Sequence, residues 1–73
     1  MKAEPGDIVV VEWKDGERDA KSFGILFKEY DYFIKIAHNL RRWPGGLYEG
    51  DYTVIPRSYV KKIRVVGKKV VRL

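Results

Sequence analysis

Three segments rich in β-branched and aromatic residues, separated by turn residues, constrain the fold of this chain most. They run from Val9 to Glu17, from Gly24 to Ile36 and from Ile55 to Ile63. β-Branched and aromatic residues favour strands, and the Asp-Gly pair at 15–16 is typical of a tight hairpin turn. Strands that follow one another so closely in 73 residues predict a small closed or half-closed barrel.

Alternating hydrophobic residues, bounded by turn signals, predict five strands and no helix. The expected strand ranges are 8–14, 20–28, 32–37, 51–55 and 62–66. Residues 39–50 contain Pro44 and three glycines, which predicts a loop without regular structure. Residues 56–59 predict a sharp turn of 3₁₀ type. Residues 69–73 predict either a further strand or a continuation of the fifth.

The length and composition indicate one folded domain over residues 1–73. Hydrophobic residues make up 45% of the chain, which is too many for a disordered tail, and cysteine is absent, which excludes a disulfide scaffold. So small a domain without disulfides or metal often gains stability by oligomerisation, so we expect a homo-oligomer. Residues 1–7 do not resemble a signal peptide and no apolar run is long enough to span a bilayer. We therefore expect a cytoplasmic protein without a membrane partner.

Charge divides unevenly between the two halves of the chain. Residues 1–36 hold six Lys or Arg and eight Asp or Glu, a net charge of −2. Residues 37–73 hold nine Lys or Arg and two Asp or Glu, a net charge of +7. If the basic half shares one face, that face attracts phosphates. The alternative is a lysine-rich surface that maintains solubility and protects strand edges.

Residue types needed for catalysis or metal binding are scarce. His38 is the only histidine and cysteine is absent, so the four nitrogen or sulfur donors of a structural zinc site are missing. The only hydroxyl nucleophiles of the serine and threonine type are Ser22, Ser58 and Thr53, and no motif places a base beside them. We expect neither an enzyme nor a resident metal or cofactor.

Two groups of basic residues are candidates for contact with nucleic acid. The first combines cations with aromatic rings and hydrogen-bonding groups. Proteins that bind single-stranded nucleic acid use this mixture, because cations contact the phosphates and bases stack on the rings. It comprises His38, Asn39, Arg41, Arg42, Trp43 and Tyr48. Alternatively, Trp43 and Leu47 pack against the end of the barrel and the arginines are merely solvated. The second group either contacts phosphate or protects a strand edge by its charge. It comprises Lys61, Lys62, Arg64, Lys68 and Lys69.

Two motifs resemble those of the Sm-like (Lsm-like) proteins, which form small β-barrels, assemble into rings and often bind RNA. The first comprises Trp13-Lys14-Asp15-Gly16, the bent strand opening Gly24-Ile25-Leu26, and the turn and strand Tyr30-Asp31-Tyr32-Phe33-Ile34. The second is Ile55 to Ile63, with its strand, tight turn and final strand. The resemblance implies an all-β, five-stranded, strongly bent barrel of Sm-like or SH3-like type. The family's N-terminal helix has no room before residue 8.

In the RNA-binding members of that family, an asparagine and an Arg-Gly pair hold the base. Here the best match to the asparagine position is Lys35, or Ile34 with a one-residue shift, and Pro56-Arg57 stands where Arg-Gly is expected. We therefore expect RNA, ahead of DNA, to be bound with little sequence preference. The expected contacts are Lys35, His38, Arg41, Arg42, Trp43, Arg57, Lys61 and Lys62. Two alternatives are an assembly module without a nucleic-acid ligand and an SH3-like chromatin protein that binds duplex DNA.

Overall fold

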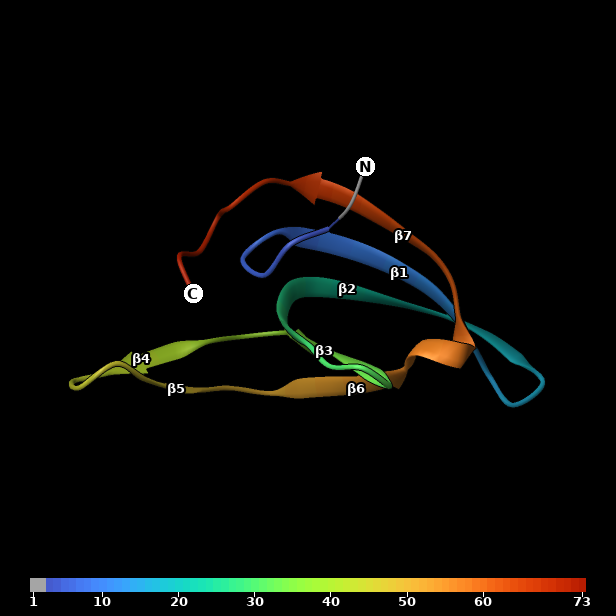
Figure 1. The fold of residues 1–73 in the computed structure, drawn as a ribbon, viewed down its shortest axis with the longest axis horizontal. Helices are drawn as coiled ribbons and strands as arrows, with labels where there is room; N and C mark the ends of the chain where they lie inside the picture. Colours follow the sequence, from blue (N-terminus) through green and yellow to red (C-terminus); the bar gives the residue numbers. More distant parts are fainter. Residues whose placement is uncertain (1–2) are drawn as a thin grey trace.

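Residues 3–73 are described in a computed structural model, which shows one curled antiparallel sheet and a projecting two-stranded arm (Figure 1). Met1 and Lys2, which the single-domain prediction and the expected absence of a signal peptide included, lie outside the described residues. The strands are β1 (Ile8–Asp15), β2 (Arg18–Glu29), β3 (Phe33–Ala37), β4 (Arg41–Trp43), β5 (Leu47–Glu49), β6 (Tyr52–Pro56) and β7 (Val60–Gly67). A 3₁₀ turn, η1 (Arg57–Tyr59), joins β6 to β7. Within residues 3–73, no helix is long and apolar enough to cross a membrane.

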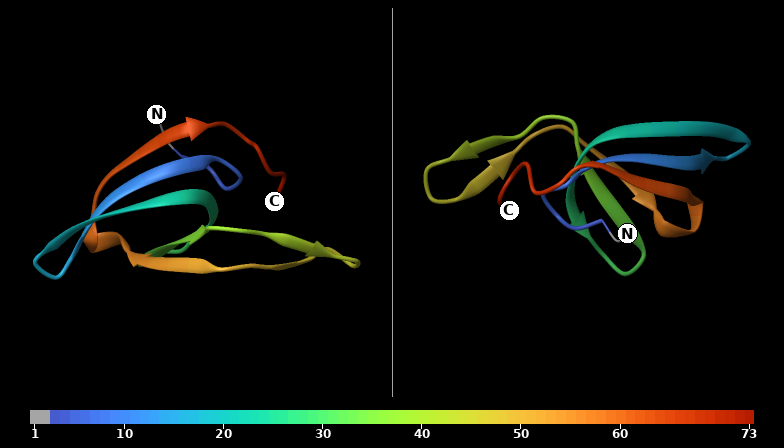
Figure 2. Two further views of the ribbon diagram at one scale, coloured as in Figure 1. Left: turned by 180° about the vertical axis from the view of Figure 1, so that it is seen from behind. Right: turned by 90° about the horizontal axis from the view of Figure 1, so that it is seen from above.

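The main sheet has the order β6-β3-β2-β1-β7, and all its neighbouring strands are antiparallel. The predicted all-β class, the five strands and the 3₁₀ turn are therefore confirmed, with boundaries that differ by one or two residues. Closure into a barrel is not observed, because no ladder joins β6 to β7 within residues 3–73. The 3₁₀ turn connects β6 to β7 at one end of the sheet. Beyond this turn the two edge strands lie apart (Figures 1 and 2).

The hydrophobic core fills the concave side of this sheet. Alternation along each strand turns one set of side chains inward, and the fully buried ones come from β1, β2, β3 and β6. They are Val9, Val11, Leu26, Ile34, Ile36 and Ile55. Ile63 and Val65 of β7 and Trp13 of β1 pack against this cluster.

A bend in β2 produces the curl. The first part of β2 pairs with β1, from Asp15↔Arg18 to Ile8↔Ile25, and the last part pairs with β3. A β-bulge between Leu26 and Lys28 lets the strand turn from one layer to the other. At Gly24 the sheet is so tight that a Cβ atom would collide with the Ala37 carbonyl oxygen. Gly24 is therefore required by close backbone approach.

The segment 39–50 differs from its prediction as an irregular loop. It forms the arm, in which β4 pairs with β5. Gly45 and Gly46 have φ values of 94° and 82°, which L-residues rarely adopt, and they reverse the chain after Pro44. The proline and glycines thus make the turn of a hairpin, and the strands flank them. In the tail after β7 (68–73), residues 69–73 were expected to form a further strand or to continue the fifth, but they form no ladder.

Gly24→Ala should lower the free energy of unfolding by about 1–3 kcal/mol, because the added methyl group has no space and the bend must open. Urea denaturation followed by circular dichroism measures the change. Gly67→Ala is the matched control: its added Cβ meets its nearest neighbours at 3.4 Å and beyond, an ordinary contact distance. This control should alter stability by no more than about 0.5 kcal/mol. Equal effects of the two substitutions would contradict the close-packing argument.

Candidate nucleic-acid interface

The arm carries three of the predicted contact residues. Its length contributes to the elongated shape of the molecule, 41 × 23 × 20 Å (Figure 1). Residues directly opposite in a hairpin share one face, and successive residues alternate between faces. The pairs are Arg41↔Glu49, Arg42↔Tyr48 and Trp43↔Leu47. Arg41 and Arg42, adjacent in sequence, therefore lie on opposite faces of the arm.

The base of the arm is held by a short polar network. The Asn39 side-chain amide donates to Asp51 Oδ2 at 2.7 Å, and the Asp51 backbone N–H donates to Asn39 Oδ1 at 3.2 Å. The backbone at Gly50 lies so close to Asn39 that a Cβ atom would collide with the Asn39 carbonyl oxygen. These contacts fix how the arm leaves the sheet, so the direction of each face is determined.

The face that carries Arg42 and Tyr48 turns toward the body of the protein. The Tyr48 hydroxyl donates to the Arg72 carbonyl oxygen at 3.1 Å, and the Tyr48 ring meets Phe27 edge-on at 6.1 Å between centroids. Phe27 also packs on Tyr52, with centroids 5.0 Å apart. Arg42 thus lies on the same face of the arm as Tyr48, and Tyr48 belongs to a cluster of three aromatic rings.

Lys35 completes this aromatic–lysine cluster (Phe27, Lys35, Tyr48 and Tyr52). Its Nζ atom lies 4.5 Å from the centroid of Tyr52 and 5.8 Å from that of Phe27, which are cation–π distances. Within residues 3–73, neither Lys35 nor Arg42 forms an ion pair with a carboxylate. Both cations therefore remain available to an external anion, beside rings on which a base can stack.

The predicted histidine contact is exposed, but both its ring nitrogens are engaged by protein groups. One ring nitrogen of His38 lies 3.0 Å from the Phe23 carbonyl oxygen, and the other lies 2.6 Å from Thr53 Oγ1. Since both nitrogens have protein partners, His38 links β2 to β6 and has no ring nitrogen left for a ligand.

The remaining predicted contacts lie away from the arm, near η1 and along β7 (Figure 1). Arg57 donates through Nε to the Tyr30 carbonyl oxygen at 2.6 Å, and its Nη2 lies 3.6 Å from Glu29. Lys61 pairs with Asp19 at 3.2 Å. Lys62 lies in β7 directly opposite Glu12 of β1. The eight predicted residues therefore form no single site, and those near η1 are largely matched by acidic groups.

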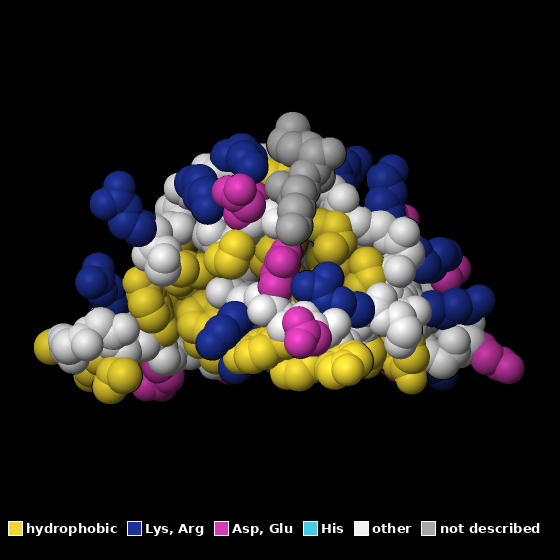
Figure 3. All heavy atoms as spheres, in the orientation of Figure 1, with side chains coloured by type: hydrophobic (Ala, Val, Ile, Leu, Met, Phe, Trp, Pro, Cys, Tyr) yellow, Lys and Arg dark blue, Asp and Glu magenta, His cyan; other side chains and the backbone are white. Residues whose placement is uncertain are grey.

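The expectation that Trp43 and Leu47 pack against the end of the sheet is wrong. Trp43 is 50% exposed and Leu47 70% exposed, both on the face of the arm that turns away from Tyr48. Hydrophobic side chains are visible along the arm in Figure 3. Sequence reasoning also missed Phe27 and Tyr52 as candidate site residues. Phe27 lies at the bulge of β2, where alternation no longer predicts which residues a side chain contacts.

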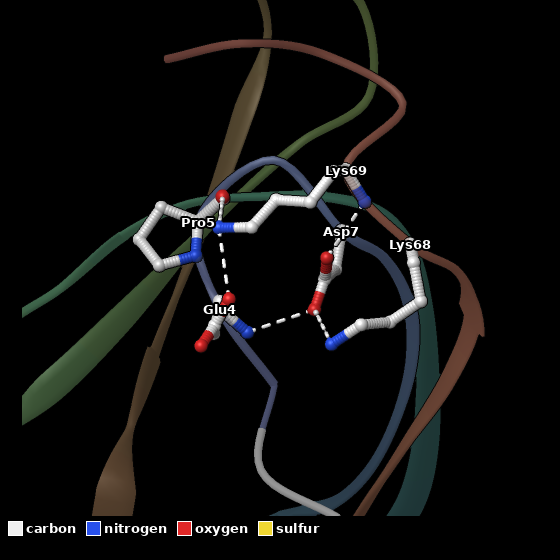
Figure 4. Close-up of polar contacts among 5 residues, drawn as sticks. All are labelled: Glu4, Pro5, Asp7, Lys68 and Lys69. Atoms are coloured by element: carbon white, nitrogen blue, oxygen red, sulfur yellow. Dashed lines mark hydrogen bonds and ion pairs between the residues drawn. The ribbon is translucent and has the colours of Figure 1, made fainter.

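The C-terminal tail that meets Tyr48 is fastened by a buried carboxylate (Figure 4). Asp7 is fully buried; its Oδ1 accepts from the Lys69 backbone N–H at 2.8 Å and its Oδ2 from the Glu4 backbone N–H at 2.9 Å. The Lys68 ammonium lies 3.4 Å from the same carboxylate. These contacts clasp the tail to the turn before β1 and so position Arg72 beside the arm.

The hydrogen bonds of this clasp favour the ionised form of Asp7. The backbone N–H of Lys69, and then that of Glu4, hold the pKa of Asp7 below its usual value of 3.8, although burial acts in the opposite direction. Lys68 adds a smaller effect of the same sign as the hydrogen bonds. The pKa of Glu4 is also lowered, chiefly by the hydrogen bond and charge of Lys69.

No family model, curated protein or solved structure matches the chain in sequence or fold comparisons. Within residues 3–73, no three His, Cys, Asp or Glu side chains are grouped so that they could hold a metal ion.

Asp7→Asn should lower the thermal midpoint at neutral pH and flatten its dependence on acid. With Asp7 present, lowering the pH protonates this carboxylate in the unfolded chain at a higher pH than in the folded chain, because folding lowers its pKa. The stability from the clasp is therefore complete above the ordinary pKa and is lost as pH falls through the lower folded pKa. Thermal unfolding from pH 2 to pH 7 measures this. Asp31→Asn, the same change at an exposed residue, should keep the native profile. An unchanged profile in Asp7→Asn would contradict the clasp.

Proposed function

We propose that this protein binds nucleic acid through the aromatic–lysine cluster and the adjoining face of the arm, with little dependence on sequence. The observation that carries the proposal is the position of Lys35 and Arg42. Both are cations without a carboxylate partner in residues 3–73. Lys35 lies over the rings of Tyr52 and Phe27, and Arg42 lies directly opposite Tyr48, whose ring meets Phe27. Positive charge beside aromatic faces suits a chain of phosphates and bases.

The resemblance to Sm-like proteins supports RNA as the preferred ligand. In the bent main sheet, the last strand, β7, lies beside the first strand, β1. Lys35, at the position where the RNA-binding members carry asparagine, is held over aromatic rings and has only donors to offer. An ammonium contacts phosphate as a point charge and cannot read the edge of a base as an amide does. Sequence-tolerant binding follows from this substitution.

The surface proposed is smaller than the set of residues considered from the sequence. Arg57 and Lys61 have acidic partners, and His38 is engaged on both nitrogens. Arg41 and Trp43 lie on the opposite face of the arm. The principal contacts proposed are therefore Lys35 and Arg42, with stacking on the cluster.

Arg42→Ala should weaken binding of a fluorescent single-stranded RNA by about 1–3 kcal/mol, because one charge-assisted contact to phosphate is removed. Fluorescence anisotropy titrations at two salt concentrations should show strong weakening by salt and similar affinity for unrelated sequences. Arg64→Ala, which removes an arginine from β7 opposite Val10, is the matched control and should bind as the native protein does.

Three outcomes of these titrations would overturn parts of the proposal. Absence of binding to any oligonucleotide at low salt would overturn nucleic-acid binding altogether. Equal losses of RNA affinity in Arg42→Ala and Arg64→Ala would show that the arm is not the specific binding surface. Tighter binding of duplex DNA than of single-stranded RNA would favour the SH3-like chromatin alternative.

The two open sheet edges favour a second candidate function, that of an assembly module. β6 pairs only with β3 and β7 only with β1 within residues 3–73, so each presents backbone groups on its outer side. Joining one copy's β6 to the next copy's β7 would satisfy both edges and, in the arrangement of Sm-like proteins, close a ring.

We expect a homo-oligomer of five or more subunits if these edges pair. Multi-angle light scattering coupled to size exclusion measures the mass directly. Val54→Pro in β6 should reduce the mass, because proline removes a backbone donor and disturbs the edge strand. A strict monomer at high protein concentration would contradict edge pairing and favour the SH3-like alternative.

A further inference from the structure

The outward face of the arm is an apolar and charged surface that the proposed nucleic-acid site does not use. It consists of Arg41, Trp43, Leu47 and Glu49, which the hairpin register places on one side. The Trp43 indole N–H donates to Glu49 Oε2 at 2.9 Å, which orients both side chains. Trp43 and Leu47 nevertheless remain 50% and 70% exposed.

This face lacks the support that the other face receives. The arm has only three residues in each strand, and isolated two-stranded hairpins are marginally stable in water. On the inner side, Tyr48 contacts Phe27 and the tail. On the outer side, the large ring of Trp43 lies beside Leu47 with nothing in residues 3–73 to cover either one fully. A partner surface would complete the packing of the arm.

We propose that the partner is a second copy of this chain, whose arm packs face to face on this arm about a twofold axis parallel to the strands. That axis places β4 of one copy over β5 of the other. Arg41 then opposes Glu49 of the second copy and Trp43 opposes its Leu47, and the symmetry repeats both contacts. The interface is isologous, as in most homodimers.

The charge pattern selects this arrangement among the possible occupants. The twofold pairing gives two ion pairs at the base of the arms and, nearer their tips, an apolar centre of four side chains. If the arms ran in opposite directions, Glu49 would face Leu47 and its carboxylate would have no cation. A phosphate backbone would meet Glu49 beside Arg41 and be repelled by it. The surface is thus complementary to itself and poorly suited to a polyanion.

The arm contact is small. A standard protein interface buries about 800 Å² on each partner, far more than four side chains of a short hairpin supply. We therefore expect reversible dimerisation that depends on protein concentration, seen most clearly in the upper micromolar range. It is independent of nucleic acid. Pairing of sheet edges involves none of these four residues and would be common to all the variants below.

Charge reversal in two separate variants tests the pairing. Arg41→Glu and Glu49→Arg should each raise the dissociation constant for arm pairing about tenfold or more, since attraction becomes repulsion in both symmetry-related contacts. An equimolar mixture should regain native association, because acidic arms then face basic arms. Sedimentation velocity of each variant and of the mixture, over a range of concentrations, measures this.

The mixture separates pairing between chains from effects within one chain. Arg41 and Glu49 are also neighbours within one arm, and an effect confined to that arm would leave the mixture as weakly associated as its components. Failure to regain mass on mixing would therefore overturn the proposal, as would a native protein whose mass does not rise with concentration. Arg42→Glu, the same reversal on the opposite face, should associate as the native protein does; equal weakening would also overturn it.

Leu47→Asp provides a test that does not depend on the Trp43–Glu49 hydrogen bond. Leu47 is largely exposed, so the folded chain should tolerate the change, whereas a carboxylate in the apolar centre should abolish concentration-dependent pairing. A native near-ultraviolet circular dichroism spectrum confirms the fold of this variant. Undiminished pairing in a folded Leu47→Asp protein would exclude the arm as the interface.

Discussion

The bend of β2 is the constraint on which the rest of this structure depends. One strand of twelve residues pairs with β1 along its first part and with β3 along its last, so both layers of the curled sheet share a continuous backbone. The bend brings Val9 and Val11 of β1 over Ile34 and Ile36 of β3, and a core forms without any helix. The bulge that makes the bend also turns Phe27 toward Tyr48 and Tyr52. The same distortion therefore closes the core and builds the aromatic part of the candidate site.

The sequence predicted the core strands well because burial on one face imposes a strict alternation. Alternation along the predicted strand 8–14 places Val9, Val11 and Trp13 on one face, and all three pack in or against the core. The arm was missed for a physical reason: Pro44 and the glycines disfavour strands locally, yet they supply the positive φ angles of a hairpin turn. Barrel closure depends on where two distant edges end in space, which no local pattern encodes.

The candidate site shows the same division between local and distant information. Lys35 is predicted from its position in the family resemblance, but the rings that it lies over, Phe27 and Tyr52, come from other strands. The engagement of His38 with Thr53 and Phe23 was invisible for the same reason. Of two adjacent arginines, only the hairpin register reveals that they serve different faces. A short arm can thus present two unrelated surfaces, one beside the body and one away from it.

The pairing of β1 with β7 has a consequence for how this chain acquires its structure. Hairpins such as β1–β2 and β3–β6 join residues that are near in sequence, whereas Val11 pairs with Ile63, 52 positions later. Contacts so distant in sequence are slow to form, because a long loop must close before any pairing compensates for its entropy. During synthesis, the outer edge of β1 therefore stays unpaired until β7 has left the ribosome. In that interval the hydrophobic run Ile8 to Val11 lies open to the wrong partner, and the late docking of β7 ends the exposure.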